Sequence, residues 1–327
     1  MIVLMKRDAT KRQMDRVINK IKEIGFQPHI DHGISTLIGI RGDTSSLDPN
    51  IFYMDGVEGV KRVSKPYKEV SKEFHPKKTV IKIGDVEIGG SYPVVIAGPC
   101  AVEDERQLLK TAEGVKEGGA HLLRGGAFKP RTSPYSFQGI GEEGLKILAD
   151  ARAKTRLPIV SEIMNQTQID LFEKYDIDVL QIGARNMQNF DLLKAIGQLK
   201  RPVLLKRGPS SSVEEFLLSA EYLLSSGNRN VILCERGIKT FETAYRNVLD
   251  FNAVALIKEL SHLPIIVDPS HGTGIQSMVV PLTYAAIAVG ADGVMVEVHY
   301  KPQSAKCDAN QQLNLIQFKE MMRSIIR

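Results

Sequence analysis

The chain has 327 residues, of which 43% are hydrophobic and 25% are charged, a balance typical of a folded, water-soluble protein with a sizeable core. A net charge of +5 is too small and too dispersed for a nucleic-acid-binding protein, and no uninterrupted apolar run is long enough to cross a membrane. The three cysteines, Cys100, Cys234 and Cys307, show no paired spacing, which argues against a disulfide framework and indicates a reducing, cytoplasmic location.

Residues 1–66 predict a small α+β domain. The strand IVLM precedes a helix whose apolar residues recur at three and four spacing until Gly25. Strands FQPHI and STLIGI follow, then a short helical segment at 51–54 and a last strand at 60–63. This β-α-β-β-α-β order is that of ferredoxin-like domains.

A charged segment, residues 67–77, is expected to link this domain to the rest of the chain, residues 78–327. The second part begins with TVIKIGDVEIGG, which alternates as a β-hairpin does and is placed to cap the closed end of a barrel. Eight short apolar runs then alternate with helical stretches: VVIAGPC, HLLRGG, PIVSEI, VLQIGA, PVLLKRG, NVILCERG, PIIVDPSHG and GVMVEVH. The pattern predicts a (β/α)8 barrel, because eight βα units suffice to close a parallel sheet.

Each apolar run ends in a polar or reactive residue. These residues are Cys100, Arg124, Glu162, Arg185, Lys206, Glu235 with Arg236, His271, and Glu297 with His299. The carboxyl ends of barrel strands share one face, where such enzymes build their active sites, so we expect these side chains to meet at one mouth.

Six basic side chains are expected in that mouth: Arg124, Lys129, Arg131, Arg185, Lys206 and Arg236. Because like charges so close repel one another, we expect phosphates and carboxylates as their partners. Lys206 also admits a different interpretation, a Schiff-base nucleophile, although its cationic surroundings favour anion binding.

Four further residues offer metal ligands: Cys100, His271, Glu297 and Asp308. A mixed set of sulfur, nitrogen and oxygen suits a borderline divalent ion better than magnesium, so we expect manganese, iron, cobalt, zinc or cadmium.

With these residues in view, the chain resembles 3-deoxy-D-arabino-heptulosonate 7-phosphate (DAHP) synthase of the type Iβ class. The resemblance rests on motifs from about residue 78 to the end: AGPC, LRGGAFKPRTSPYSFQG, QIGARNMQN, LLKRG, ILCERG, VDPSHGTG, VEVH and CDANQQL. It implies metal-dependent condensation of phosphoenolpyruvate with erythrose 4-phosphate and water, the first step of the shikimate pathway to aromatic amino acids.

The resemblance also implies residue roles. Arg185 and Arg236 would bind the phosphate of phosphoenolpyruvate, and Arg124, Lys129 and Lys206 its carboxylate end. The substrate-binding set is Arg124, Lys129, Pro130, Arg131, Thr132, Ala184, Arg185, Lys206, Arg236 and Asp308, within which Arg131 and Thr132 would hold the acceptor's phosphate. Lys129, Glu162 and His271 would be catalytic. Lys129, expected to have a depressed pKa amid other cations, would give a proton to the aldehyde oxygen, and Glu162 would orient the water.

The N-terminal domain resembles, more weakly, a regulatory (ACT-like) domain of this class. This implies inhibition by tyrosine or phenylalanine and assembly into a homotetramer, with His29 and Asp31, expected at the tip after the second strand, as candidate effector contacts. An ordinary polar loop is the alternative for both residues.

Three rival functions remain open. The first is 3-deoxy-D-manno-octulosonate 8-phosphate synthase, a relative that uses arabinose 5-phosphate and usually has KANRS where this chain has KPRT. The second is a Schiff-base aldolase, and the third an inactive barrel that only senses amino acids. The sequence also departs from the family at Cys307, where serine is usual. Because Cys307 is expected close to the site, one hypothesis is that it pairs with Cys100 when metal is absent and conditions are oxidising. The alternative, which a reducing cytoplasm favours, is a packing cysteine with no such role.

Overall fold

The structure is a computed structural model that describes residues 1–32, 36–63 and 65–325. Two compact units divide the chain: Met1–Lys78 with Glu259–His262, and Thr79–Lys258 with Leu263–Arg327. None of the helices within the described ranges is long and apolar enough to cross a membrane.

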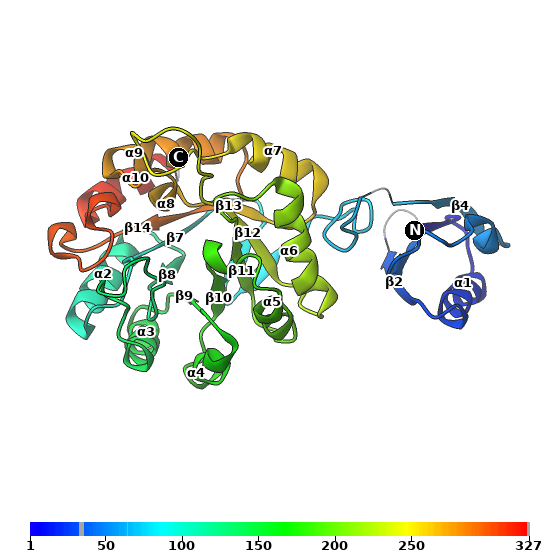
Figure 1. Cartoon of the computed structure of the whole chain (residues 1–327), viewed down its shortest axis with the longest axis horizontal. Coiled ribbons are helices and arrows are strands. Elements are labelled where there is room, and N and C mark those ends of the chain that lie inside the picture. The colour runs from blue at the N-terminus through cyan, green and yellow to red at the C-terminus, as the bar shows by residue number, and fades with distance from the viewer. Residues whose placement is uncertain (33–35, 64, 326–327) are drawn as a thin grey trace. The chain divides into compact units, whose positions relative to one another are not determined.

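The first unit contains a four-stranded antiparallel sheet in the order β2-β3-β1-β4 (Figure 1). Its elements are β1 (Ile2–Met5), α1 (Lys11–Glu23), β2 (Gln27–His32), β3 (Thr36–Arg41), the 3-10 helix η1 (Pro49–Phe52) and β4 (Val57–Lys61). The ferredoxin-like order is therefore present, although a single 3-10 helix stands where the second helix was expected. The last strand begins at Val57, before the predicted 60–63, because pairing with β1 rather than the apolar pattern sets its bounds.

Residues 67–77, predicted as a linker, pack within the first unit. Tyr67, Val70 and Phe74 are buried, and the Phe74 ring fills the space beside Gly39, where an added Cβ would lie 2.1 Å from it. The Arg41 guanidinium lies 2.8 Å from the Glu69 carboxylate. The segment is folded because burial of its aromatic and aliphatic side chains, which alternate with charged residues, stabilises it.

The two regulatory candidates lie within strand β2, not at its tip. His29 stacks on Phe74 at 5.1 Å between ring centroids, and the Asp31 carboxylate lies 3.7 Å from His75 Nδ1. Residues 33–35, the rest of the predicted tip, lie outside the described residues. The prediction of a loop was wrong because β2 extends to His32 through its pairing with β3.

The second unit is the predicted barrel. Its eight parallel strands close in the order β10-β11-β12-β13-β14-β7-β8-β9, which confirms the (β/α)8 fold. The strands are β7 (Val94–Gly98), β8 (Leu122–Arg124), β9 (Ile159–Glu162), β10 (Val179–Ile182), β11 (Val203–Lys206), β12 (Val231–Glu235), β13 (Ile265–Val267) and β14 (Gly293–Glu297). All eight coincide with the eight apolar runs, because strands buried on both faces are continuously apolar.

Helices surround these strands in Figure 1. They are α2 (Glu105–Glu117), α3 (Glu142–Thr155), α4 (Ile169–Lys174), α5 (Phe190–Gly197), α6 (Val213–Ser225), α7 (Phe251–Leu260), α8 (Pro269–Thr273), α9 (Gln276–Ala288) and α10 (Leu315–Ile325). Short 3-10 helices η2 (Gln166–Gln168), η3 (Ala184–Asn186), η4 (Pro302–Ser304) and η5 (Ala309–Gln311) lie in the loops.

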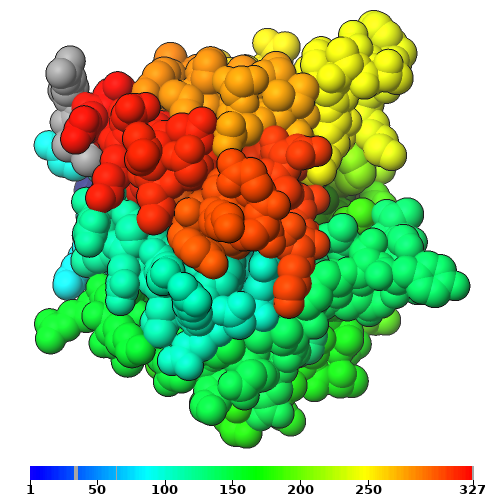
Figure 2. All heavy atoms as spheres, turned by 90° about the vertical axis from the view of Figure 1, so that its left-hand side faces the viewer, coloured from blue at the N-terminus to red at the C-terminus, as the bar shows by residue number. Residues whose placement is uncertain are grey.

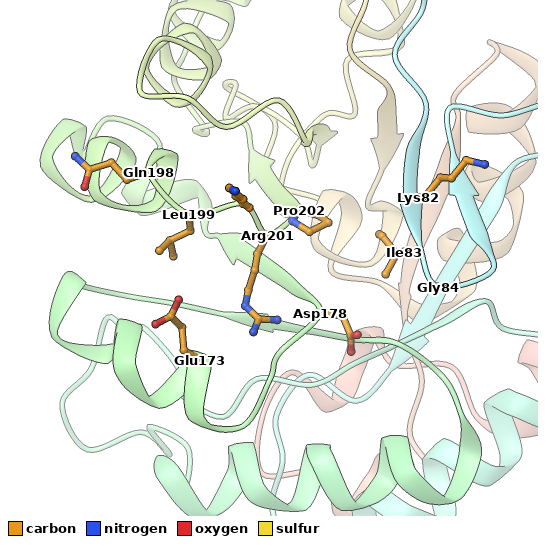
Figure 3. Close-up of a pocket in the computed structure, with 10 residues that line it drawn as sticks. Lys82, Ile83, Gly84, Glu173, Asp178, Gln198, Leu199, Arg201 and Pro202 are labelled. Carbon is orange, nitrogen blue, oxygen red and sulfur yellow. The ribbon is translucent and has the colours of Figure 1, made fainter.

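The predicted hairpin, β5 (Ile81–Ile83) and β6 (Val86–Ile88), packs its isoleucines into the core formed by the amino-terminal parts of the barrel strands. A hollow of about 580 Å³ beside it is lined by Lys82, Ile83, Gly84, Glu173, Asp178, Gln198, Leu199, Lys200, Arg201 and Pro202 (Figure 3). Two of its charged residues form ion pairs within the protein: Arg201 pairs with Asp176 at 2.8 Å, and Asp178 pairs with Arg152 at 3.1 Å. We therefore expect the active site at the opposite end of the strands.

Candidate active site

Loops after the barrel strands surround a cleft of about 630 Å³ at their carboxyl ends. In Figure 2 the loop after β14, coloured orange-red, lies at the centre of this face, with the yellow loop after β12 to its upper right and the green loop after β8 to its right. All six basic residues expected in the mouth line this one cleft.

Two more basic residues, Lys239 and Arg246, join them from the loop after β12. The lining side chains that carry charge are Arg124, Lys129, Arg131, Arg185, Lys206, Arg236, Lys239 and Arg246 against Glu162 and Asp308, so the cleft is strongly positive. Sequence reasoning missed Lys239 and Arg246 because they lie in a loop rather than at a strand end. The available signal was their position in the segment that follows a site-bearing strand.

Buried carboxylates neutralise part of this charge. Arg124 Nη1 lies 3.2 Å from Glu297 Oε1, and Lys206 Nζ lies 2.5 Å from Asp268 Oδ2. Two of the expected basic residues thus already have carboxylate partners within the protein. Both acids are fully buried, where an unpaired charge is costly, so each ion pair fixes its cation in place.

Arg236 has less compensation. Burial, opposed mainly by Asp268, lowers the pKa of its guanidinium. A buried cation that is still disfavoured in this way is well suited to accept an incoming phosphate, because the anion removes the electrostatic cost of burial. Arg185 lies nearby and donates a hydrogen bond to Thr132 Oγ1 at 3.4 Å.

Lys129 extends beneath the loop that carries it. Its Nζ donates to the Cys100 carbonyl at 3.2 Å, and its side chain passes Gly126, where an added Cβ would lie 2.6 Å from Lys129 Cδ. Burial opposes the charged form, but attraction by Cys100 and Glu162 outweighs it and raises the pKa of Lys129. The expected depression of this pKa was wrong, because the electrostatic effects of Cys100, Glu162 and Cys307 together exceed those of burial and of Arg124. These three residues come from other segments, and their proximity to Lys129 is not evident from the spacing along the chain.

The rest of the KPRT loop, Pro130, Arg131 and Thr132, lines the cleft. The guanidinium of Arg131 donates a close hydrogen bond to the sulfur of Cys307. Arg131 is therefore hydrogen-bonded to Cys307 in this structure, while Thr132 accepts a hydrogen bond from Arg185.

Glu162 reaches the cleft from the end of β9. Gln181 Nε2 donates to its Oε2 at 3.1 Å. Gly183 makes room for the carboxylate, since a Cβ at that position would lie 2.0 Å from Glu162 Oε1. Ala184, the next residue, begins η3 and lines the same cleft.

His271 lies in α8, immediately after β13. Its Nδ1 contacts Asp268 Oδ2 at 2.7 Å, and its Nε2 lies 3.3 Å from Glu297 Oε1. Burial alone would raise the pKa of Asp268, but the charges of His271 and Lys206 outweigh it and hold that pKa well below its usual value. An ionised Asp268 thus orients the ring and leaves Nε2 directed at Glu297, as in carboxylate-histidine-metal arrangements.

The four candidate metal ligands form two overlapping sets instead of one. His271, Glu297 and Asp308 place their ligand atoms within 4.8 Å of one another, and Cys100 and Asp308 do the same together with Cys307. Asp308 belongs to both sets and adopts a left-handed backbone conformation with φ of 49°, which is rare outside glycine and recurs at functional sites.

The donor chemistry fits a metal ion. Glu297 Oε1 is buried without a hydrogen-bond partner, and it faces His271 Nε2. The oxygen has an ion pair with Arg124 at 3.2 Å but no hydrogen bond, so it keeps lone pairs that a further cation beside the imidazole nitrogen would satisfy. These residues are therefore able to hold a divalent ion.

Two buried thiols complete this region. Cys100 Sγ lies 3.0 Å from Cys307 Sγ and 3.4 Å from Asp308 Oδ2. The hydrogen bond to Cys307, together with burial, raises the pKa of Cys100, whereas the bond from Cys100 lowers the pKa of Cys307. All three cysteines of the chain are free thiols in this structure.

Asp268, Gln311 and Gln312 were not predicted as site residues. Gln311 Nε2 donates to Glu297 Oε2 at 2.6 Å. Gln312 accepts from the Cys100 amide at 3.2 Å and donates to the Cys307 carbonyl at 2.8 Å. The motifs VDPSHG and CDANQQL contain all three residues, so their proximity to predicted ligands was the available signal.

Fold and cleft together define a barrel enzyme that binds small, multiply charged anions. Residues 70–326 match the DAHP synthetase I family, and residues 1–65 match the DAHP synthase ferredoxin-like domain. The chain belongs to the DAHP synthase family.

Individual relatives agree with this family. The phospho-2-dehydro-3-deoxyheptonate aldolase of Thermotoga maritima is 50% identical over 99% of this chain and 96% of its own length. The crystal structure of the DAHP synthase from Thermotoga maritima superposes with a TM-score of 0.79 at 49% identity, covering 99% of this chain and 96% of that one. A 2-dehydro-3-deoxyphosphooctonate aldolase of Syntrophotalea carbinolica is 35% identical over 75% of this chain and 94% of its own.

Proposed function

We propose that this chain condenses phosphoenolpyruvate with erythrose 4-phosphate and water, forming DAHP and phosphate at the entry to the shikimate pathway. The observation that carries the proposal is the single cleft lined both by the basic residues and by His271 and Asp308. Two phosphorylated substrates need several cations, and an aldehyde acceptor needs an electrophilic centre next to them.

The residues at the strand ends divide this work. Arg185 and Arg236 bind the phosphate of phosphoenolpyruvate, while Arg124, Lys129 and Lys206 bind its carboxylate end. Arg131 and Thr132, with Pro130 and Ala184 shaping the cleft, hold the phosphate of the acceptor. The ion pairs behind Arg124 and Lys206 keep these two cations oriented before substrate arrives, which reduces the ordering cost of binding.

Cys100, His271, Glu297 and Asp308 would hold a divalent ion of manganese, iron, cobalt, zinc or cadmium, which would supply Lewis-acid polarisation of the acceptor's aldehyde. Held in this orientation, C3 of the enol phosphate forms a bond to the aldehyde carbon, and Lys129 delivers a proton to the aldehyde oxygen. Glu162 orients water toward C2, and the C2–O bond then breaks to release phosphate. A Glu162→Gln variant with unaltered turnover would remove Glu162 from this scheme.

The sequence-related alternative is 3-deoxy-D-manno-octulosonate 8-phosphate synthesis from arabinose 5-phosphate. The similarity to the octonate aldolase named above favours it as a second candidate, but only over three quarters of the chain. The deciding assay follows phosphoenolpyruvate consumption with each sugar phosphate, with and without a chelator. Preference for erythrose 4-phosphate supports the proposal, preference for arabinose 5-phosphate overturns it, and indifference to the chelator removes the metal.

Residues 1–66 form the regulatory domain in this proposal and residues 78–327 the catalytic barrel, in a cytoplasmic homotetramer inhibited by tyrosine or phenylalanine. His29 and Asp31 are the proposed effector contacts. An exchange of His29 for alanine should weaken inhibition while the KM for both substrates stays unchanged. Equal inhibition of both proteins would dismiss His29 from this role.

A further inference from the structure

Cys307 is a sulfur at the metal site to which the proposed function assigns no task. It is 2% exposed, and its Sγ belongs to a set of three ligand atoms with Cys100 and Asp308. We propose that Cys307 supplies a second sulfur ligand, which makes the centre selective for thiophilic divalent ions such as zinc and cadmium. The inference rests on the metal dependence in the proposed function.

The distances agree with a shared ion. Two sulfurs bound tetrahedrally at about 2.3 Å from zinc lie about 3.8 Å apart, and a sulfur and a carboxylate oxygen lie about 3.6 Å apart. The structure has 3.0 Å between Cys100 Sγ and Cys307 Sγ, and 3.4 Å between Cys100 Sγ and Asp308 Oδ2. The distance between the two sulfurs therefore has to increase by less than about 1 Å for both to bind one ion.

The backbone fixes both cysteines for this purpose. They lie 207 residues apart in sequence, and one buried amide, that of Gln312, accepts from the Cys100 N–H and donates to the Cys307 carbonyl. Outer contacts of this kind hold metal ligands in position.

Hydrogen bonding identifies the Cys307 sulfur as an acceptor. It accepts from the Cys100 thiol and from the guanidinium of Arg131, so both donors contact sulfur lone pairs, which a metal ion would also bind. Arg131 lies at the start of an exposed stretch, residues 132–135, and is able to move away when an ion takes its place. Softer ions gain most from this exchange, because sulfur ligands select thiophilic metals over manganese and magnesium.

The test is cadmium binding to the full chain, measured by ultraviolet sulfur-to-metal charge-transfer absorbance per bound ion. Cys307→Ser should lower this absorbance to about half, because one of two sulfurs is lost, and should weaken cadmium at least about tenfold while manganese affinity changes little. Cys234→Ser is the matched control, since Cys234 is equally buried but belongs to the barrel core. It should retain the full absorbance.

X-ray absorption of the zinc-loaded, unaltered protein is the second measurement, and it does not depend on a variant that folds. Two sulfurs at about 2.3 Å support the inference. One sulfur, or an undiminished absorbance in Cys307→Ser, overturns it and leaves the proposed function intact. Failure of the unaltered protein to bind any ion overturns both this inference and the metal role in the proposed reaction.

Discussion

For Lys129, the pKa that its neighbours along the chain suggest differs from the pKa that its surroundings in the fold produce. The sequence places it among arginines, which implies repulsion, but in the fold it is 8% exposed and lies against the Cys100 carbonyl and near Glu162. Its ammonium group is therefore stabilised, so it binds as a cation first and gives up its proton only as negative charge develops on the aldehyde oxygen.

Lys129→Met should reduce turnover at least about 100-fold, because both the charge and the transferable proton are lost. Lys129→Arg keeps the charge and should preserve much of the affinity for phosphoenolpyruvate while turnover stays low. Steady-state kinetics with separate kcat and KM values distinguishes the two effects. Near-normal turnover in Lys129→Met would contradict the proton-donor role.

Cys100 and Cys307 should also respond to oxidants. Treating the metal-free protein with a low-molecular-weight disulfide should join them, with two equivalents of the small thiol released, because 3.0 Å is within easy reach of an S–S bond of about 2.05 Å. Thiol titration of the unfolded product should then find one cysteine, Cys234. Three titratable thiols after the treatment would show that the pair does not form, and bound metal should protect both.

At the scale of the elements, the site is built from the ends of the barrel strands, each of which places one or two polar side chains at the mouth. The eight apolar runs predicted all eight strands, since period and length suffice to recognise strands buried on both faces. The contacts between loops could not be predicted in this way. Arg131 on Cys307, and Gln312 between Cys100 and Cys307, join segments far apart in the chain.

Gly183, between β10 and η3, leaves the space that the Glu162 carboxylate occupies in the site. Gly183→Ala should displace the Glu162 carboxylate, because the new Cβ would meet Oε1 at 2.0 Å, and the flexible end of that side chain is able to move. We expect stability to change by about 1 kcal/mol or less while turnover falls at least about tenfold. Thermal unfolding and kcat are the two measurements.

Gly59→Ala in β4 is the matched control, since an added Cβ there meets no heavy atom within 4 Å. It should leave turnover unchanged. A Gly183→Ala protein with full activity would show that the position of Glu162 is not critical, whereas loss of folding would show that the strand end itself depends on this glycine.

At the scale of the whole molecule, the two compact units have different chemistry. The barrel gathers its charges at one mouth, whereas the first unit gathers rings: His29, Phe74, His75 and His262. His262 is 4% exposed, its Nε2 lies 2.7 Å from the Glu69 carbonyl, and its ring stacks on His75 at 4.3 Å between centroids. Burial is the main cause that lowers its pKa to about 4. The charged or titratable groups that face this cluster are His29, His75, Lys72, Asp31 and Arg41.

The first unit should therefore lose stability in acid. His262 has a pKa of about 4 when folded and about 6.5 when unfolded, so the unfolded chain binds an extra proton between these values. The free energy of unfolding should be unaffected above pH 6.5 and decrease by about 3 kcal/mol as the pH falls to 4. Hydrogen exchange of the β1 and β3 amides measures this directly.

His262→Gln keeps a donor for the Glu69 carbonyl and does not titrate, so it should remove most of this slope. His32→Gln, in which an exposed histidine is replaced, serves as the control and should retain it. An identical slope in the unaltered protein and in His262→Gln would assign the pH response to other groups.

The sequence by itself determined the barrel, its eight strands, the capping hairpin and the side chains at the strand ends, because these depend on local apolar period and on a fixed polarity of parallel strands. Only the tertiary structure decided which charges meet: that Asp268 and Glu297 neutralise Lys206 and Arg124, that the pKa of Lys129 rises, and that Arg131 donates to Cys307. Electrostatic and ligand contacts are set by distances of a few ångströms between loops distant in sequence, and no pattern along a single chain records those distances.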